Sequence, residues 1–239
     1  MPKVVLVTGG SRGIGSAICR KFAAEGYIVA VNYEKSEEKA KALADELGGR
    51  AYRADVSDYK QVTEMVDKIE AELGGVDVLI NNAAISVVGL FQDMTDEEWD
   101  RLFGVNVKGV FHCTKRVLGH MLHEQSGSIV NISSMWGVTG GSCESHYSAA
   151  KAAVIGYTRA LAKELGPSGI RVNCVAPGTV DTEMNSHLSA EDMEELRDET
   201  PIGHIGTPEE IAEAVFFLAS EKASFITGEV LNANGGFAI

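Results

Sequence analysis

The sequence predicts an α/β fold, in which a parallel sheet is covered by helices on both faces. Short runs rich in valine and isoleucine alternate with longer segments of helical period, and most of these runs are almost continuously apolar. Strands buried on both faces of a parallel sheet give runs of this kind. A third observation is the glycine-rich turn that directly follows the first run. The 239-residue length suits one α/β domain, so we expect a single domain over residues 1–239.

Seven strands are expected from the apolar runs. They cover residues 3–8, 27–33, 50–54, 76–81, 128–133, 170–175 and 229–232. Two apolar stripes with helical spacing lie between them: Ile14, Ala17, Ile18 and Phe22 form one, and Ala150, Val154, Tyr157, Leu161 and Leu165 form the other. We therefore expect helices to cover the sheet.

Helix ends are also marked in the sequence. Thr95 with Glu98, and Thr207 with Glu210, have the spacing of capping boxes, which predicts helices beginning near residues 96 and 208. Glycines commonly end helices, and Gly26 and Gly166 stand at such positions. The acidic segment 186–200 allows two interpretations, a mobile flap or a solvated surface helix, and we favour the helix.

The formal net charge of −13 makes the chain strongly acidic. Such a charge repels nucleic acid phosphates and anionic lipids, so we expect neither a nucleic-acid partner nor binding to a membrane surface. No apolar run reaches the roughly 18 residues that a membrane-spanning helix needs, and the N-terminal segment reaches Gly9 before a signal-peptide core could form. These features predict a cytoplasmic protein.

Neither cysteine nor histidine spacing predicts a metal site. The chain has four cysteines, Cys19, Cys113, Cys143 and Cys174. They form no CxxC pair, so we expect small buried apolar side chains rather than disulfides or zinc ligands. His120 and His123 have no third ligand nearby, and HExxH is absent, so we expect these histidines at a solvated helix end.

The first expected strand leads into the sequence TGGSRGIG at residues 8–15, and a helix begins within this motif. Glycines there allow a sharp turn and let the backbone approach a pyrophosphate, whose charge is favoured by the N–H groups at the helix N-terminus. The spacing TGxxxGxG differs from the simpler GxGxxG pattern. We therefore expect a dinucleotide-binding turn.

A second motif is Tyr147 followed by Lys151, which places a phenol and an amine on one helix face. A YxxxK pattern arises by chance about 0.3 times in a chain of this composition, so it carries little weight alone. Four other segments accompany it and raise its weight: Ser134 at the end of an expected strand, Asn106 within NVKG, NNAA at residues 81–84 after the fourth strand, and Pro177 with Gly178 after the sixth. Open α/β sheets bind ligands outside the carboxyl ends of their strands.

Together these motifs resemble the short-chain dehydrogenase/reductase family, and the resemblance extends over essentially the whole chain to ITG at residues 226–228 and Gly235-Gly236. It implies a single-domain Rossmann fold with a seven-stranded parallel sheet. It also implies an NAD(P)-dependent oxidoreductase that interconverts carbonyl and alcohol groups. The substrate pocket would be built from loops, chiefly residues 134–146 and 178–203.

The resemblance implies a catalytic role for four residues. Tyr147 would be the general acid that protonates the carbonyl oxygen, and Ser134 would hydrogen-bond that oxygen. Lys151 would hold the nicotinamide ribose and lower the pKa of the phenol, and Asn106 would support a water-mediated proton relay. A cation within about 4–6 Å favours the ionised form of a phenol, whose free pKa is near 10. The hydride would come from the cofactor.

The same resemblance implies a set of cofactor contacts along the carboxyl ends of the strands. They are Gly9, Ser11, Arg12, Gly13, Ile14, Gly15, Asn32, Asp55, Val56, Asn82, Ala83, Tyr147, Lys151, Pro177, Gly178, Val180 and Thr182. The usual NNAG of the family reads NNAA here, and the methyl group of Ala84 could shift the backbone near the cofactor.

NADP is favoured over NAD as the cofactor. NAD-binding relatives usually carry an acid at the end of the second strand, and this position looks like Asn32 here. Arg12 stands in the glycine-rich turn, where relatives that use NADP often place a basic residue for the 2′-phosphate. Glu34 is the alternative, because it could bind the ribose 2′-hydroxyl if the strand is longer. We expect a lower Michaelis constant for NADPH than for NADH.

Within the family, VTGGSRGIG, VNY, NVKG, VAPG and ITG resemble 3-oxoacyl-[acyl-carrier-protein] reductases. This resemblance implies reduction of a β-keto thioester to the 3-hydroxy product. Those enzymes commonly carry basic residues for the acidic carrier protein at two segments, which read HEQSG at residues 123–127 and GPSG at residues 166–169 here. With a net charge of −13, electrostatic steering of an acidic carrier would be poor.

A second interpretation comes from SSMWG and Ser142-Cys143-Glu144, which resemble the elongation factor P 5-aminopentanone reductases. The ammonium group of such a substrate would pair with Glu144 and lie against Trp136. Alternatively, Glu144 is a solvated loop residue and Trp136 belongs to the core. The same chemistry also fits a sugar or alcohol dehydrogenase.

A catalytically inactive NADP-binding regulatory protein is a further alternative, which the presence of all four catalytic positions disfavours. Family resemblance also implies a homotetramer. Its subunit contacts would involve the helix expected near residues 96–123 and the catalytic helix at residues 146–165.

Overall fold

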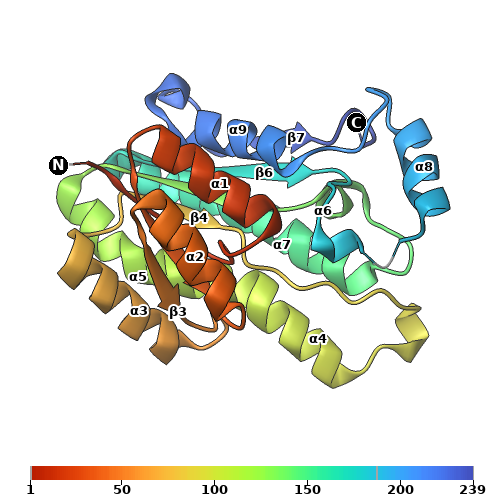
Figure 1. Ribbon diagram of the computed structural model, residues 1–239, viewed down its shortest axis with the longest axis horizontal. Helices are drawn as coiled ribbons and strands as arrows, with labels where there is room; N and C mark the ends of the chain where they lie inside the picture. Colours follow the sequence, from red (N-terminus) through yellow and green to blue (C-terminus); the bar gives the residue numbers. More distant parts are fainter. Residues whose placement is uncertain (1, 187, 239) are drawn as a thin grey trace.

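The sheet of the computed structural model is parallel, with strand order β3-β2-β1-β4-β5-β6-β7 (Figure 1). The structure describes residues 2–186 and 188–238. The strands are β1 (Val4–Val7), β2 (Ile28–Tyr33), β3 (Arg50–Arg53), β4 (Val78–Asn81), β5 (Gly127–Ile132), β6 (Ile170–Pro177) and β7 (Val230–Ala233). All seven predicted strands are confirmed, and the α/β class is correct.

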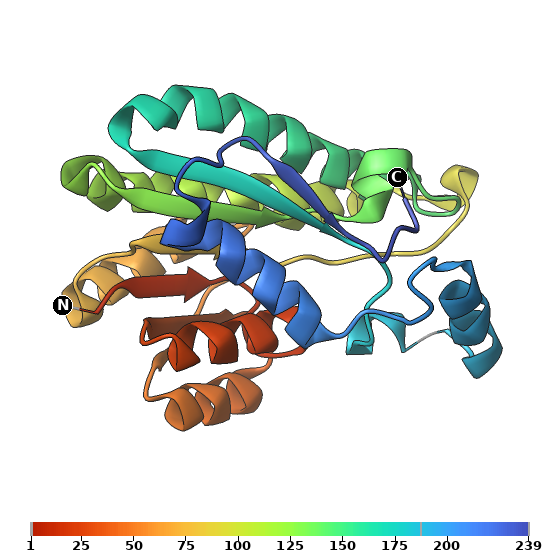
Figure 2. The same ribbon diagram turned by 90° about the horizontal axis from the view of Figure 1, so that it is seen from above.

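Helices cover both faces of the sheet. One face carries α1 (Gly13–Ala24), α2 (Glu37–Leu47) and α9 (Pro208–Ala219), and the other carries α3 (Tyr59–Leu73), α5 (Gly109–Glu124) and α7 (Ser145–Leu165). Figure 2 shows this layering, with α1 and α9 on one side of the sheet and α5 and α7 on the other. Side chains alternate between the two faces of β1, so Val5 and Val7 join the first core cluster and Leu6 joins the second.

The short helices gather at the end of the molecule towards which the strands point (Figure 1). They are α4 (Asp96–Phe103), α6 (Met135–Thr139) and α8 (Ala190–Glu199). β1 lies between β2 and β4, so the strand order reverses there and opens a crevice beyond the carboxyl ends of these strands. The glycine-rich turn begins at this point.

The helix expected near residues 96–123 is interrupted. α4 passes into a π-helical turn, η2 (Gly104–Lys108), before α5 begins. π-helical turns inside α-helices are frequent at functional sites, and this one contains Asn106. Four short 3₁₀ turns complete the described structure: η1 (Phe91–Asp93), η3 (Gly166–Ser168), η4 (Glu183–Asn185) and η5 (Glu221–Ala223).

The predicted capping boxes at Thr95 and Thr207 are confirmed. Gly26 follows α1 with φ of +83°, as a terminating glycine does. Gly166 also ends its helix, but it has φ of −53°, and Gly169 is the residue of this turn that adopts the left-handed conformation, with φ of +71°.

The acidic segment forms a surface helix, as favoured from the sequence. None of the residues of α8 is buried, and position 187 of the segment lies outside the described residues. Three of the cysteines are buried as expected, but Cys143 is partly exposed and has φ of +60°. In the described part of the chain, no helix is both long and apolar enough to cross a membrane.

Candidate active site

The glycine-rich turn is fixed to the end of β4 by hydrogen bonds. The hydroxyl of Thr8 accepts hydrogen bonds from the backbone N–H groups of Asn82, at 2.9 Å, and Ala83, at 3.0 Å. The side-chain amide of Asn82 donates to the carbonyl oxygens of Thr8, at 2.9 Å, and Gly9, at 3.1 Å. Asn82 therefore holds the turn through contacts within the protein.

Two of the glycines are required by close packing. A Cβ atom at Gly9 would lie 2.9 Å from the Cα atom of Ala83, and a Cβ atom at Gly15 would lie 2.3 Å from the carbonyl oxygen of Gly9. Gly13 has more space but a φ of +52°, which favours glycine. These glycines let α1 start directly beside the end of β4.

The N-terminus of α1 faces a cleft of about 430 Å³. Arg12 at the N-cap makes no side-chain capping bond within the described structure, and the first turn contains no acidic residue. The helix N–H groups and dipole therefore favour an anion here. An open cleft with this anion-binding end fits a dinucleotide, whose pyrophosphate would lie against residues 11–15.

Most of the predicted cofactor residues line this cleft. They are Gly9, Ser11, Arg12, Gly13, Ile14, Gly15, Asn32, Asp55, Val56, Asn82, Ala83 and Thr182, and Ala84 lines it as well. Pro177, Gly178 and Val180 precede Thr182 in the chain but are not among the residues that line the cleft. Gly178 donates to the carbonyl oxygen of Ala233 at 3.0 Å, and Val180 is buried.

The side chain of Asn32 makes hydrogen bonds within the protein that were not predicted from the sequence. Its side chain is only 1% exposed, and its oxygen accepts a hydrogen bond from the N–H group of Gly9 at 3.1 Å. Its nitrogen donates to the carbonyl oxygen of Ala54 at 3.1 Å. Asn32 thus joins the glycine-rich turn to the end of β3, and Glu34 is the acid near the end of β2 that lines the cleft with a partly exposed side chain.

Arg101 of α4, which was not predicted from the sequence, contacts two residues that line the cleft. It donates to Asp55 at 2.7 Å, to Ser57 at 2.8 Å and to Glu34 at 3.2 Å. Burial raises the pKa of Asp55, but hydrogen bonds from Ser57 and Arg101 outweigh this effect and hold the pKa below its usual value. Arg101 thereby ties α4 to the segments that follow β2 and β3.

The structure brings Ser134, Tyr147 and Lys151 together. Ser134 follows β5 and caps α6, while Tyr147 and Lys151 lie one turn apart on α7, and all three side chains are buried. The Nζ atom of Lys151 lies 5.5 Å from the centroid of the Tyr147 ring and donates to the carbonyl oxygen of Ile132 at 2.8 Å.

The expected lowering of the phenol pKa by Lys151 is not found. Burial raises the pKa of Tyr147, the charge of Glu144 raises it further, and a hydrogen bond with Ser134 opposes them. Burial also lowers the pKa of Lys151, to about 8. Loss of hydration is the largest cause of both shifts.

Asn106 is linked to α7 through Ile85. Its side-chain oxygen accepts a hydrogen bond from the N–H group of Ile85, and its side-chain nitrogen donates to the carbonyl oxygen of the same residue, both at 2.9 Å. Ile85 packs against the cluster that contains Leu102, Tyr147 and Ala150. The Asn106 side chain therefore positions the segment after β4 beside Tyr147.

The two predicted substrate residues have clear neighbours. Trp136 is partly buried and packs edge-to-face on Phe237, with ring centroids 5.9 Å apart. The carboxylate of Glu144 accepts a hydrogen bond from the hydroxyl of Ser86 at 3.0 Å. Trp136 is thus only partly in the core, and Glu144 is not freely solvated. The interpretation of Trp136 as a core residue and Glu144 as a solvated loop residue therefore describes neither side chain fully.

A buried polar network beneath the site was also missed. Asn81 and Asn131 are register partners on β4 and β5, and their side chains hydrogen-bond at 2.9 Å. Asn81 also donates to Thr114 of α5 at 3.2 Å, and Asn131 donates to Thr158 of α7 at 2.9 Å. Asn81, at the end of one predicted strand, and Asn131, inside another, were the available signal. Their side chains fix α5 and α7 to the sheet.

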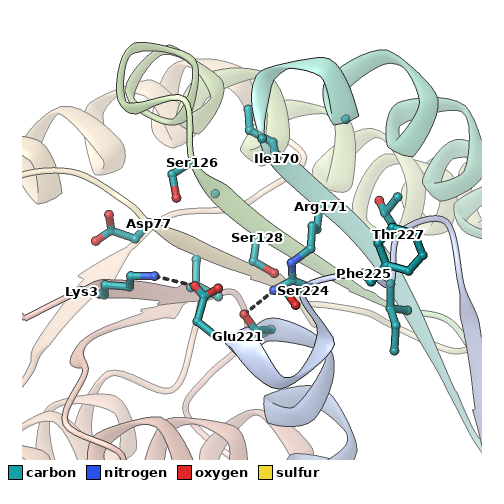
Figure 3. A pocket seen from close by; sticks show the side chains of 16 residues that line it. Lys3, Asp77, Ser126, Ser128, Ile170, Arg171, Glu221, Ser224, Phe225 and Thr227 are labelled. Atoms are coloured by element: carbon teal, nitrogen blue, oxygen red, sulfur yellow. Dashed lines mark hydrogen bonds and ion pairs between the residues drawn. The ribbon is translucent and has the colours of Figure 1, made fainter.

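A second cavity, of about 470 Å³, lies at the amino ends of the central strands (Figure 3). Lys3 and Glu221 pair beside it at 3.1 Å, and Arg171 donates to the carbonyl oxygens of Ala219 and Ser220 near the end of α9. None of the predicted catalytic or cofactor residues lines this cavity. The cleft at the carboxyl ends, which most of the predicted cofactor residues line, is therefore the candidate cofactor site.

Comparisons with known proteins agree with this geometry. The family model described as enoyl-(acyl carrier protein) reductase matches residues 9–238. An acetoacetyl-CoA reductase of Rhizobium meliloti is 46% identical over 237 residues, covering 99% of this chain and 98% of its own. A 3-oxoacyl-[acyl-carrier-protein] reductase, FabG, of Staphylococcus aureus is 43% identical over 241 residues, with the same coverage of 99% and 98%. The chain therefore belongs to the short-chain dehydrogenase/reductase family of oxidoreductases, which act on ketone and alcohol groups with a nicotinamide cofactor.

Proposed function

We propose that this protein is an NADPH-dependent reductase of 3-oxoacyl thioesters. The observation that carries the proposal is the buried set of Ser134, Tyr147 and Lys151 at the same sheet edge as the glycine-rich turn. The printed names of two relatives, an acetoacetyl-CoA reductase and a 3-oxoacyl-[acyl-carrier-protein] reductase, support the substrate class.

Bound NADPH supplies the hydride in this chemistry. Tyr147 donates the proton from its phenol to the carbonyl oxygen of the substrate, and the hydroxyl of Ser134 hydrogen-bonds that oxygen. The raised pKa of Tyr147, caused first by its burial, keeps the phenol protonated and able to act as an acid. Lys151 supplies a positive charge that favours the phenolate left after proton transfer.

The preference for NADPH is supported by the charges around the adenosine end of the cleft. Arg12 lines the cleft, and Lys39 of α2 shares a carboxylate partner with it. Glu34, which would favour NAD by binding a ribose 2′-hydroxyl, lies 3.2 Å from the guanidinium of Arg101. This ion pair leaves Glu34 less available for a ribose hydroxyl.

The acyl carrier of the substrate is either the carrier protein or coenzyme A. Residues 123–127 and 166–169, where carrier-binding relatives commonly carry basic side chains, lack lysine and arginine here. Ser126, Gly127, Gly166 and Gly169 line the cavity at the amino ends of the strands, away from the cleft within one chain. Their composition therefore says little about the charge at the mouth of this chain's own cleft.

An amino ketone is a second candidate substrate, favoured by the position of Glu144. Its carboxylate is close enough to Tyr147 to raise the pKa of the phenol, and a substrate ammonium group could pair with it. Reduction of an amino ketone should then depend on this charge far more than reduction of a neutral ketone.

We also propose that the protein is cytoplasmic. We further propose that it forms a homotetramer, with α5 and α7 at the subunit contacts. Both helices lie on one face of the sheet, and α5 exposes Phe111 and Leu122. Light scattering coupled to size-exclusion chromatography tests the oligomeric state, and a monomeric mass would overturn the tetramer.

A substrate comparison tests the proposed activity. Purified protein is assayed with NADPH and NADH against acetoacetyl-CoA, an acetoacetyl carrier protein, an amino ketone and crotonyl-CoA, which tests enoyl reduction. We expect oxidation of NADPH with an acetoacetyl thioester and little turnover of crotonyl-CoA. Turnover of crotonyl-CoA alone, or of the amino ketone alone, would overturn the proposed substrate class.

A further inference from the structure

Glu183 holds two cations from different parts of the chain. It begins η4, in the segment between β6 and α8, and one of its carboxylate oxygens lies 3.0 Å from Nη1 of Arg12 in the glycine-rich turn. The other oxygen lies 2.6 Å from Nζ of Lys39 on α2. These two partners lower the pKa of Glu183, so its carboxylate is charged.

The ion pairs lie at the adenosine end of the cofactor cleft. Arg12 and Glu183 both line the cleft, together with residues 33–36, which follow the end of β2. All three charged side chains are more than half exposed, at 61% for Arg12, 54% for Glu183 and 56% for Lys39. Ion pairs between exposed groups are weak, so a more highly charged anion can displace the carboxylate.

We propose that Glu183 is a specificity-determining residue, which competes with the 2′-phosphate of NADPH for Arg12 and Lys39. This inference rests on the proposed function. The phosphate and the carboxylate both need the donor groups of these cations, and the two anions repel each other when they share them. NADH carries a neutral hydroxyl group in place of the phosphate, so Glu183 does not oppose its binding in this way.

The competition should also change how firmly the segment that carries Glu183 is held. The residue next to it, Thr182, lines the same cleft, and the ion pairs join this segment to α1 and α2. Displacement of Glu183 by a 2′-phosphate frees the segment from both cations. The protein therefore binds NADPH more weakly than it would if Arg12 and Lys39 were not paired with Glu183. Its preference for NADPH over NADH is reduced accordingly.

The test compares cofactor affinities in the absence of substrate. We expect Glu183→Gln to lower the Kd for NADPH by about five- to tenfold and to change the Kd for NADH by less than about twofold, as measured by fluorescence titration. Glu213→Gln is the matched control, because Glu213 also pairs with a lysine, Lys21 at 2.8 Å, but lies outside the cleft. It should change neither Kd.

Further variants identify the cations that mediate the effect. Arg12→Gln and Lys39→Gln should each weaken NADPH binding, and Glu183→Gln should have little effect on NADPH affinity when both cations are already replaced. An unchanged ratio of the two dissociation constants in Glu183→Gln would overturn the inference. Failure of the unmodified protein to bind NADPH would instead reject the proposed cofactor, so the two failures are distinguishable.

Discussion

The amine of Lys151 lies 5.5 Å from the ring centroid of Tyr147, while its hydrogen bond goes to the carbonyl oxygen of Ile132 at 2.8 Å. The two side chains occupy one face of α7, and both are buried. Burial disfavours the charged form of each group, so it lowers the pKa of the amine and raises that of the phenol. Burial therefore governs the acid–base behaviour of both groups.

Lys151→Met should abolish catalysis, and its stability relative to the unmodified protein should fall between pH 7 and pH 10. Burial lowers the pKa of Lys151 from 10.5 to about 8, which corresponds to a cost of about 3 kcal/mol in folding free energy while the amine is charged. This cost is present below pH 8 and disappears as the pH rises towards 10.5. Denaturant unfolding at pH 7 and pH 10 measures it. A stability difference between the variant and the unmodified protein that is the same at both pH values would contradict the lowered pKa of Lys151.

The reduction rate should fall at alkaline pH. We expect kcat/KM for reduction to decrease above about pH 8, because deprotonation of Lys151 removes the positive charge beside Tyr147. Lys151→Arg keeps its charge to much higher pH, so any residual activity of this variant should lose that decrease. The same alkaline decrease in the arginine variant would mean that another group causes it.

Glu144→Gln should change the acid–base behaviour of Tyr147. The charge of Glu144 raises the pKa of the phenol, second only to burial, so its removal should lower that pKa. In the reverse reaction Tyr147 acts as the base, and the pH dependence of alcohol oxidation should move to lower pH by a fraction of a unit to about one unit. Glu97→Gln, at an exposed position in the first turn of α4, is the control and should leave the profile in place.

Asn106→Ala should reduce both stability and catalysis. The substitution leaves the N–H and C=O groups of Ile85 without their partners, which costs about 2–4 kcal/mol in the free energy of unfolding. Ile85 packs against the cluster containing Tyr147, so kcat should fall about tenfold as the phenol loses its position. Gln92→Ala removes an exposed amide from η1 and should change stability by less than about 0.5 kcal/mol. Equal effects of both substitutions would contradict this role of Asn106.

The strands could be predicted because burial on both faces leaves a continuous apolar run in the sequence. β6, for example, contains seven buried residues among its eight, Ile170–Pro177. The relationship between Tyr147 and Lys151 was also accessible, since residues four apart lie on one face of a helix. These features depend on local spacing, which the sequence displays directly.

Other site features depend on contacts between distant segments. Arg12 and Glu183 are 171 residues apart, and several exposed acids compete for each exposed cation, so no local pattern indicates this pair. The hydrogen bonds of Asn32, on β2, likewise join the glycine-rich turn on one side to the residue after β3 on the other. They depend on how these segments pack together. The π-helical turn η2 separates α4 from α5, and no proline marks this interruption in the sequence.

The central claim is that Tyr147 supplies the proton for NADPH-dependent reduction of a 3-oxoacyl thioester. The most direct measurement compares kcat for acetoacetyl-CoA and the Kd for NADPH in the unmodified protein and in Tyr147→Phe. Loss of a general acid predicts a fall in kcat of about 10²–10⁴-fold, with a Kd for NADPH within about threefold of the unmodified value. A variant that keeps more than about one tenth of the original kcat would contradict the claim.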